Sequence, residues 1–231
     1  MRVALVRGCL LALGLALPGA AGAACRLALV LALDVSSSVD ASEDRLQREG
    51  LAKALLAPEV VRAFLAGDPV ALYVFEWSGR SVQVPLLPSW MVVRSEEDLE
   101  RIAGTVAASL RSRDDSSTAV GAALRFAAGA LEAGPDCGAR TIDVSGDGIG
   151  NDGVRPRAVY WTFPPDVTVN ALVIGGERMD SPLVTWFASE VVRGPESFWM
   201  HLSGYAGYEE AMRRKLLREL LVPAVSKAPL E

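Results

Sequence analysis

The apolar segment LALVLAL, residues 27–33, constrains the fold of this chain more than any other feature of the sequence. It is continuous, and it ends abruptly at Asp34. Continuous apolar runs of this length are typical of strands covered on both faces, as in parallel sheets that lie between two layers of helices. The sequence therefore predicts a buried central strand whose carboxyl end carries Asp34 to one edge of a sheet.

Further apolar segments alternate with segments of helical periodicity along the rest of the chain. This alternation predicts an α/β fold, Rossmann-like and doubly wound, with a mainly parallel sheet and helices on both faces. In such folds ligands bind outside the carboxyl ends of the strands, where the strand order reverses. The segment 81–87 is expected at a sheet edge because Pro85 cannot donate a backbone hydrogen bond. We expect strands at residues 27–33, 70–77, 81–87, 141–144, 167–174 and 198–202.

Signals for helix starts precede several of the expected helices. Asp40 and Glu43 form a pattern similar to a capping box, and the helix that follows is expected to carry Leu46 inward. Ser95 starts a helix whose apolar residues recur at helical spacing as far as Leu110. The remaining helices are expected at 118–131 and over a C-terminal apolar stripe formed by Met212, Leu216, Leu217, Leu220 and Leu221.

The first 24 residues have the pattern of a secretory signal peptide. Two arginines precede an apolar run at 9–17, and small residues follow at 19–24. A membrane anchor is the alternative, but the run is much shorter than the ~20 residues needed to cross a bilayer, and Pro18 ends it. We therefore expect residues 1–24 to be a signal peptide and 25–231 to be one domain, periplasmic or secreted, without a membrane span.

Charge and cysteine content restrict the partners and the compartment further. Loss of residues 1–24 would leave 21 Lys and Arg against 28 Asp and Glu, a net charge of −7, which disfavours nucleic acid as a partner. Cys9 would leave with the signal peptide, so that Cys25 and Cys137 remain. Outside the cytoplasm such a pair is oxidised more readily than inside it.

The residues after the first expected strand carry oxygen atoms suited to a hard cation. Asp34, Ser36 and Ser38 follow a D-x-S-x-S pattern that puts three oxygen donors on one turn. Mg²⁺ requires oxygen ligands in near-octahedral geometry, whereas zinc prefers nitrogen or sulfur. The chain has one histidine and no close cysteine pair, which disfavours a zinc site. A helix cap is the simpler alternative for these serines.

The motif DVSSS at 34–38 resembles the metal-ion-dependent adhesion site of von Willebrand factor A-type domains. The resemblance implies two further ligands, a threonine on a second loop and an aspartate on a third. Thr118 in SSTAVGAAL and Asp147 in DVSGDG match these positions. Asp143 is the alternative to Asp147, but Asp147 occupies the Asp-Gly position at the end of the strand, and Asp143 would need a partner inside the sheet.

A second resemblance covers nearly all of the chain after residue 24. Motifs such as IDVSGDGIGNDG and VNALVIGG are similar to those of a bacterial family of secreted A-type domains described only as of unknown function. The resemblance implies Mg²⁺ or Mn²⁺ held by Asp34, Ser36, Ser38, Thr118 and Asp147. It also implies that an Asp or Glu carboxylate of a protein partner completes the metal shell. On this interpretation the protein is a binding module and not an enzyme.

Two alternatives remain open at this stage. The first is a domain that binds its partner through another face, without metal. The second is a hydrolase, either with a Ser-His-Asp triad built from His201 and Ser36 or Ser145, or with metal-assisted chemistry, for which the sequence offers no evident general base.

The five tryptophans are interpreted as packing residues of the core or its rim. For Trp77, at the end of the second expected strand, contact with a partner is the alternative interpretation. The other four are Trp90, Trp161, Trp186 and Trp199.

The resemblance to A-type domains also implies a disulfide. In those domains the first strand lies beside the strand of the third metal loop, and both run in the same direction. Cys25 precedes Asp34 by nine residues and Cys137 precedes Asp147 by ten, so both cysteines are expected at the amino ends of neighbouring strands. Adjacent strands lie ~4.8 Å apart, within the separation that a disulfide accepts. We therefore predict a Cys25–Cys137 bridge.

Overall fold

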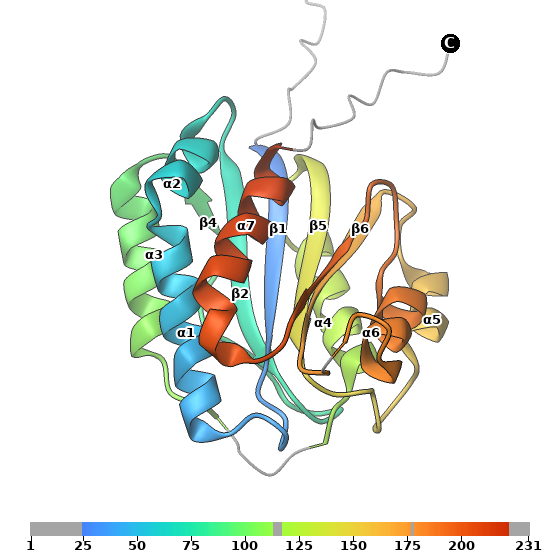
Figure 1. Ribbon diagram of the computed structural model, residues 1–231. Helices are drawn as coiled ribbons and strands as arrows, with labels where there is room; N and C mark the ends of the chain where they lie inside the picture. Colours follow the sequence, from blue (N-terminus) through green and yellow to red (C-terminus); the bar gives the residue numbers. More distant parts are fainter. Residues whose placement is uncertain (1–24, 113–116, 177, 222–231) are drawn as a thin grey trace, which may run out of the picture.

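A seven-stranded sheet runs through the centre of the computed structural model, which describes residues 25–112, 117–176 and 178–221 (Figure 1). The expected signal peptide, residues 1–24, lies outside these ranges. The strand order is β3-β2-β1-β5-β6-β7, and β4 also pairs with β2. The strands are β1 (Cys25–Asp34), β2 (Val70–Trp77), β3 (Gln83–Pro85), β4 (Met91–Val93), β5 (Cys137–Gly146), β6 (Val167–Ile174) and β7 (Trp199–Leu202).

The sheet is mainly parallel, as the sequence predicts. β1 pairs in parallel with both β2 and β5, and β6 and β7 continue in the same direction. The short strands β3 and β4 are antiparallel to β2, and Pro85 lies on β3 at the edge. β5 is longer than the expected 141–144, because residues 137–140 gain their strand conformation by pairing with β1. β4 was not predicted.

Helices cover both faces of β1, which explains its continuous apolar sequence. Leu29 and Leu31 pack among the residues of α1, α2, α3 and α7, whereas Val30 and Ala32 face the residues of α4 and α5 on the other side (Figure 1). The helices are α1 (Ala41–Leu55), α2 (Pro58–Leu65), α3 (Glu96–Ala108), α4 (Val120–Glu132), α5 (Pro156–Val159), α6 (Pro182–Trp186) and α7 (Tyr208–Leu221).

The start of α1 is fixed by the predicted capping box. Asp40 Oδ1 accepts hydrogen bonds from the backbone N–H groups of Ser42 at 2.7 Å and Glu43 at 2.9 Å, and Glu43 Oε2 accepts from Asp40 N at 2.9 Å. These bonds satisfy N–H groups that have no partner inside the helix. The residues between Asp34 and Asp40 are thereby confined to one short loop at the carboxyl end of β1.

Some side chains differ from expectation. α3 ends at Ala108, where Ser109 Oγ donates to Val106 O at 2.6 Å, so Leu110 lies outside the helix and is 89% exposed. Leu46 is 40% exposed, not buried, and Leu221 is 69% exposed at the end of α7.

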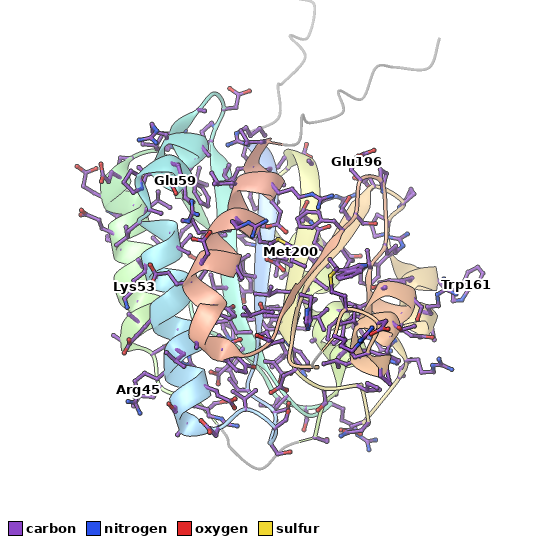
Figure 2. The ribbon with its side chains drawn as sticks, viewed as in Figure 1. Arg45, Lys53, Glu59, Trp161, Glu196 and Met200 are labelled. Atoms are coloured by element: carbon purple, nitrogen blue, oxygen red, sulfur yellow. A yellow bond between two sulfur atoms is a disulfide. The ribbon has the colours of Figure 1, made fainter. Side chains whose placement is uncertain are left out.

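The tryptophans divide between the core and the surface. Trp77 is wholly buried, which excludes its alternative role as a contact residue for a partner. The interpretation as a packing residue is wrong for Trp161, which is 92% exposed and projects from the edge of the molecule in Figure 2. Across the described ranges, no helix has the length and apolar character needed to cross a membrane.

The predicted disulfide joins the amino ends of β1 and β5. Cys25 and Cys137 are direct register partners, their Cα atoms are 4.6 Å apart, and their sulfur atoms are bonded. Both residues are buried. The bridge closes a segment in which the two cysteines are 112 positions apart.

Removing this bridge should destabilise the protein without changing its fold. In the double variant Cys25→Ser/Cys137→Ser we expect the free energy of unfolding in urea to fall by about 2–5 kcal/mol, because the unfolded chain regains the freedom that the bridge removes. Equal urea midpoints for the oxidised wild type and the double variant would contradict this expectation, as would two free thiols in a mass spectrum of the oxidised, unreduced protein.

Candidate metal centre

Three loops meet at the carboxyl edge of the sheet, the lower edge in Figure 1. The first follows β1, the second leads into α4, and the third follows β5. Asp34 is the last residue of β1, and Asp147 is the first residue after β5. Because β1 and β5 are parallel neighbours, the two aspartates emerge side by side at the same edge.

The Asp34 carboxylate is held rigidly by its own loop. Asp34 is wholly buried, and its Oδ1 accepts a hydrogen bond from Ser36 N at 2.8 Å. Its Oδ2 lies 3.4 Å from Asp147 N, which donates to it from the third loop. Gln47 Nε2, on α1, donates to the Asp34 backbone carbonyl at 2.9 Å. The carboxylate is therefore held by the first and third loops, and α1 holds the backbone of the same residue.

Two serine hydroxyls connect this loop to Asp147. Ser36 Oγ lies 3.2 Å from Ser38 Oγ, and Ser38 Oγ donates to Asp147 Oδ1 at 2.5 Å. Ser36 is buried, Asp147 is half-buried and Ser38 is exposed to solvent. Four of the five predicted residues thus form one hydrogen-bonded cluster that begins in the core and ends at the surface.

Thr118 reaches the same cluster from the second loop. Its backbone N–H donates to Asn151 Oδ1 at 2.9 Å, and Asn151 N donates back to Thr118 O at 2.9 Å. A Cβ added at Gly148 would lie 3.2 Å from Thr118 Oγ1 and 3.7 Å from Ser38 Oγ, so the two hydroxyls border the same small space. Thr118 therefore borders the space at Gly148 that Ser38 also borders, next to the four hydrogen-bonded residues.

Negative charge is unfavourable in this cluster. Burial raises the pKa of Asp34 to about 7, and the charge of Asp147 raises it as well, against the hydrogen bonds from Ser36. Burial also raises the pKa of Asp147. Two carboxylates close together in a poorly solvated place repel each other, and a positive charge between them would relieve the repulsion.

Asp143, the alternative to Asp147, lies elsewhere. It is buried within β5, and its Oδ1 lies 2.6 Å from Lys215 Nζ on α7. Lys215 also forms an ion pair with Glu219 at 2.7 Å. Asp143 thus has the internal partner that its place in the strand requires, and Asp147 is the aspartate that contacts the other predicted residues.

Several residues that support the loops were not predicted. Arg111 Nη2 donates to the backbone carbonyls of Val35 and Ser36, each at 2.9 Å, and so holds the first loop from the α3–α4 connection. Asn151 positions Thr118, as described above. Asp152 accepts from Ser117 Oγ at 2.9 Å and from Arg80 N at 3.1 Å. The Asn-Asp-Gly sequence at 151–153 is the one local signal that could have identified this support, because Asn and Asp commonly bind nearby backbone in turns.

The donor set consists of two carboxylates and three hydroxyls. Within the described ranges, no three His, Cys, Asp or Glu side chains cluster in a way that could hold a metal ion. Oxygen donors from Asp, Ser and Thr suit hard divalent cations such as Mg²⁺ or Mn²⁺.

The fold is that of von Willebrand factor A domains, as comparisons with solved structures show. Proximal thread matrix protein 1 from the mussel byssus, in a structure with a zinc-occupied metal-ion-dependent adhesion site motif, matches with a TM-score of 0.59 and 16% identity, over 86% of this chain and 48% of that one. A von Willebrand factor type A protein from Catenulispora acidiphila matches with a TM-score of 0.57 and 14% identity, over 85% and 43%. The pilus adhesin SpaC from Lactobacillus rhamnosus GG matches with a TM-score of 0.60 and 12% identity, over 85% and 31%. The chain thus spans less than half of each of these proteins.

The sequence places the chain in a particular family within this fold. Residues 24–224 match the model of a family described as "Protein of unknown function (DUF1194)", and the chain belongs to that family. A search of curated proteins finds no match. The predicted resemblance to A-type domains is therefore confirmed for the fold, while the function follows from neither comparison.

The repulsion between the two site carboxylates leads to a prediction about stability without metal. In EDTA at neutral pH, Asp147→Asn should raise the free energy of unfolding by up to about 1 kcal/mol, because it removes one of two repelling charges and keeps an acceptor for Ser38. Urea denaturation measures this change.

Asp152→Asn, on the same loop, is the matched control. Arg80 and Ser117 stabilise the Asp152 carboxylate, and its pKa is lowered by these contacts, so this variant should be less stable than the wild type. If both variants lose stability to the same extent, the repulsion inferred at the site is wrong.

Proposed function

We propose that the protein is a metal-dependent protein-binding module, in which Asp34, Ser36, Ser38, Thr118 and Asp147 hold Mg²⁺ or Mn²⁺ and an acidic residue of a partner protein completes the site. The observation that carries the proposal is the convergence of two carboxylates and three hydroxyls at the carboxyl edge of the sheet. These are the donor types that a hard divalent cation selects.

Buried polar atoms beside the cluster support a hydrated cation there. Trp77 is the register partner of Asp34, and Ser78 is the next residue. Neither Trp77 Nε1 nor Ser78 Oγ has a hydrogen-bond partner among the described residues. Ser78 O accepts from Ala119 N at 2.9 Å, which places it next to Thr118. Buried polar groups of this kind commonly bind ordered water, and Mg²⁺ usually retains part of its own water shell.

The number of donors explains why this site would bind a partner. Asp34 and Asp147 together formally balance a divalent cation, and the five donors leave one position of a near-octahedral shell open to a further oxygen ligand. When bound, the cation supplies a positive centre that attracts a carboxylate oxygen. Ser38 is exposed at this point, so a partner can approach it from solvent. Direct binding of a carboxylate requires that group to lose water, which favours a partner of matching shape.

Exposed apolar side chains border the same face. Ile149, two residues after Asp147, is 43% exposed, and Leu110, next to Arg111, is 89% exposed. Apolar residues beside a charged anchor are typical of protein interfaces, where they exclude water from the central contact. The partner is therefore expected to be a protein that presents an Asp or Glu among apolar residues.

The structure gives little support to a serine hydrolase. His201 Nε2 lies 3.0 Å from two backbone carbonyl oxygens of the loop after β6. The hydroxyls of Ser36 and Ser145 are bonded to Ser38 and Tyr208. The serines and the histidine that a triad would combine thus have other partners. The solved structures of similar fold reported above are a thread matrix protein, an A-type domain and a pilus adhesin.

The proposed compartment is the periplasm or the exterior of the cell. The Cys25–Cys137 bridge supports it, because disulfides persist in oxidising compartments. The signal pattern at 1–24 supports it independently.

The net charge of the chain, −5, gives no attraction for nucleic acid.

Metal binding should stabilise the wild-type protein and not a variant that lacks Asp34. We expect Mg²⁺ or Mn²⁺ to raise the melting temperature progressively, corresponding to about 2.7 kcal/mol when the metal is at 100 times its dissociation constant. Asp34→Ala should fold and show no response, because it loses a charged ligand and keeps the buried strand. Ser38→Ala should respond more weakly than the wild type, since water can replace a hydroxyl. Calorimetry or a thermal shift assay measures all three proteins.

The same proteins then distinguish this function from metal-independent binding. Proteins captured from the native envelope fraction by the wild type with Mg²⁺ should be absent with EDTA and absent with Asp34→Ala. If folded Asp34→Ala retains the same partner with equal affinity, the domain binds through another face and the metal-dependent function is refuted.

A further inference from the structure

Trp161 is the most exposed large apolar side chain in the described part of the chain, at 92%. It lies in the short helical turn Tyr160–Thr162, directly after α5. A single exposed apolar residue needs no functional explanation. Trp161, however, borders a surface hollow of about 710 Å³. We call this hollow the Trp161 surface, and it is lined chiefly by Arg155, Arg157, Tyr160, Trp161, Glu190 and Arg193.

The Trp161 surface is basic, although the chain as a whole carries a net charge of −5. Glu190 is its one acid, and it pairs with Arg155 at 2.5 Å. Arg157 is exposed, and within the ranges that the structure describes neither Arg157 nor Arg193 forms an ion pair with a carboxylate. Two guanidinium charges beside the exposed indole are therefore left without a counter-charge.

The floor of this surface is held in place by several contacts. The Arg193 guanidinium lies over the rings of Tyr160 and Phe163, 5.3 Å and 5.6 Å from their centroids, and its Nη1 donates to Val167 O at 3.1 Å. The Tyr160 hydroxyl donates to the backbone carbonyl of Val191. Val191 and Glu190 belong to the π-helical segment Phe187–Val191, and π-helical turns are rare and occur frequently at functional sites. The arginines thus surround a preformed aromatic wall.

The Trp161 surface is separate from the candidate metal centre. Figure 1 shows α5 at the side of the molecule, beyond β6, whereas the metal loops lie at the lower edge. Figure 2 shows Trp161 projecting outward from that side. A partner bound here would need no metal ion.

We propose that the Trp161 surface binds an acidic segment of a partner protein, with an apolar side chain of the segment against the indole of Trp161 and its carboxylates on Arg157 and Arg193. Charge complementarity carries this choice of occupant, because a carboxylate supplies the counter-charge that these arginines lack. Trp, Tyr and Arg are also the side chains that contribute most to protein interfaces. The inference is independent of the proposed metal-dependent function.

Other occupants fit this surface less well. A sugar would need hydrogen-bonding partners for its hydroxyls, but none of the described residues that line the hollow is Ser, Thr, Asn, Gln or Asp. A symmetric dimer formed through this surface would place its arginines opposite their own copies, and like charges in an interface are unfavourable.

Binding of a synthetic acidic peptide tests the inference. The probe contains pairs of Glu separated by single Leu residues, its matched form has Gln in place of Glu, and EDTA is present throughout so that the metal centre cannot contribute. By titration calorimetry the Glu peptide should bind the wild type, and added salt should weaken the binding. The Gln peptide should bind at least about tenfold more weakly than the Glu peptide.

Three variants assign the binding to this surface. Trp161→Ala should weaken binding of the Glu peptide at least about tenfold, and Arg157→Ala about threefold or more. Arg178→Ala is the matched control, because it removes an equally basic, exposed side chain that pairs with Asp180 and does not line the hollow. It should bind the peptide like the wild type. All three should keep the wild-type urea midpoint to within a small difference, since each side chain is exposed.

Several results would overturn the inference. They are no binding of the Glu peptide, equal binding of the Gln peptide, or undiminished binding by Trp161→Ala. Binding to polyuronate or to vesicles of phosphatidylglycerol that depends on Trp161, without binding of the peptide, would assign the surface to a sugar or to a membrane instead. Self-association of the wild type that Trp161→Ala abolishes, again without peptide binding, would assign it to a second copy of the chain. The metal-dependent function is unaffected by each of these results.

Discussion

The parallel pairing of β1 with β5 is the interaction on which the rest of the structure depends. At the amino ends of these strands it brings Cys25 and Cys137 into register, and at the carboxyl ends it brings Asp34 beside Asp147. One pairing thus creates both the covalent link and the charged site, at opposite edges of the sheet. Burial of β1 on both faces supplies the hydrophobic stabilisation that holds two like charges together.

Two groups of buried charge in this fold are balanced in different ways. Behind β5, Asp143 and Glu219 share Lys215, so this group contains its own cation. At the carboxyl edge, Asp34 and Asp147 are surrounded by hydroxyls and backbone N–H groups, and the charge of Arg111 offsets only part of the rise in the pKa of Asp147 that burial causes. Buried acids whose charge is incompletely balanced are costly, and a cation from solution is the simplest means of balancing them. The group formed by Asp34 and Asp147 can therefore bind a cation from solution, whereas the group formed by Asp143 and Glu219 already contains the ammonium of Lys215.

The sequence predicted the features that depend on local pattern. The apolar run at 27–33 predicted a strand buried on both faces, and the D-x-S-x-S pattern together with the resemblance to A-type domains implied residues that the structure brings together. Local pattern predicted this strand only over 141–144, because CGAR has weak strand propensity, whereas the resemblance to A-type domains implied that Cys137 lies at the amino end of a strand beside the first. Leu110 continued a helical pattern, but the helix ends before it. Arg111 acts across a long sequence separation, which a local pattern cannot reveal.

The proposed function requires a divalent cation at the three loops that carry Asp34, Thr118 and Asp147. Crystals grown with Mn²⁺ and measured at wavelengths near its absorption edge test it most directly, because anomalous scattering locates the ion independently of the protein atoms. We expect one strong peak within coordination distance of the side-chain oxygens of Asp34, Ser36, Ser38, Thr118 and Asp147 or of water bound to them. A well-ordered map with no peak there, or with the peak beside Asp143 and Glu219, would contradict it.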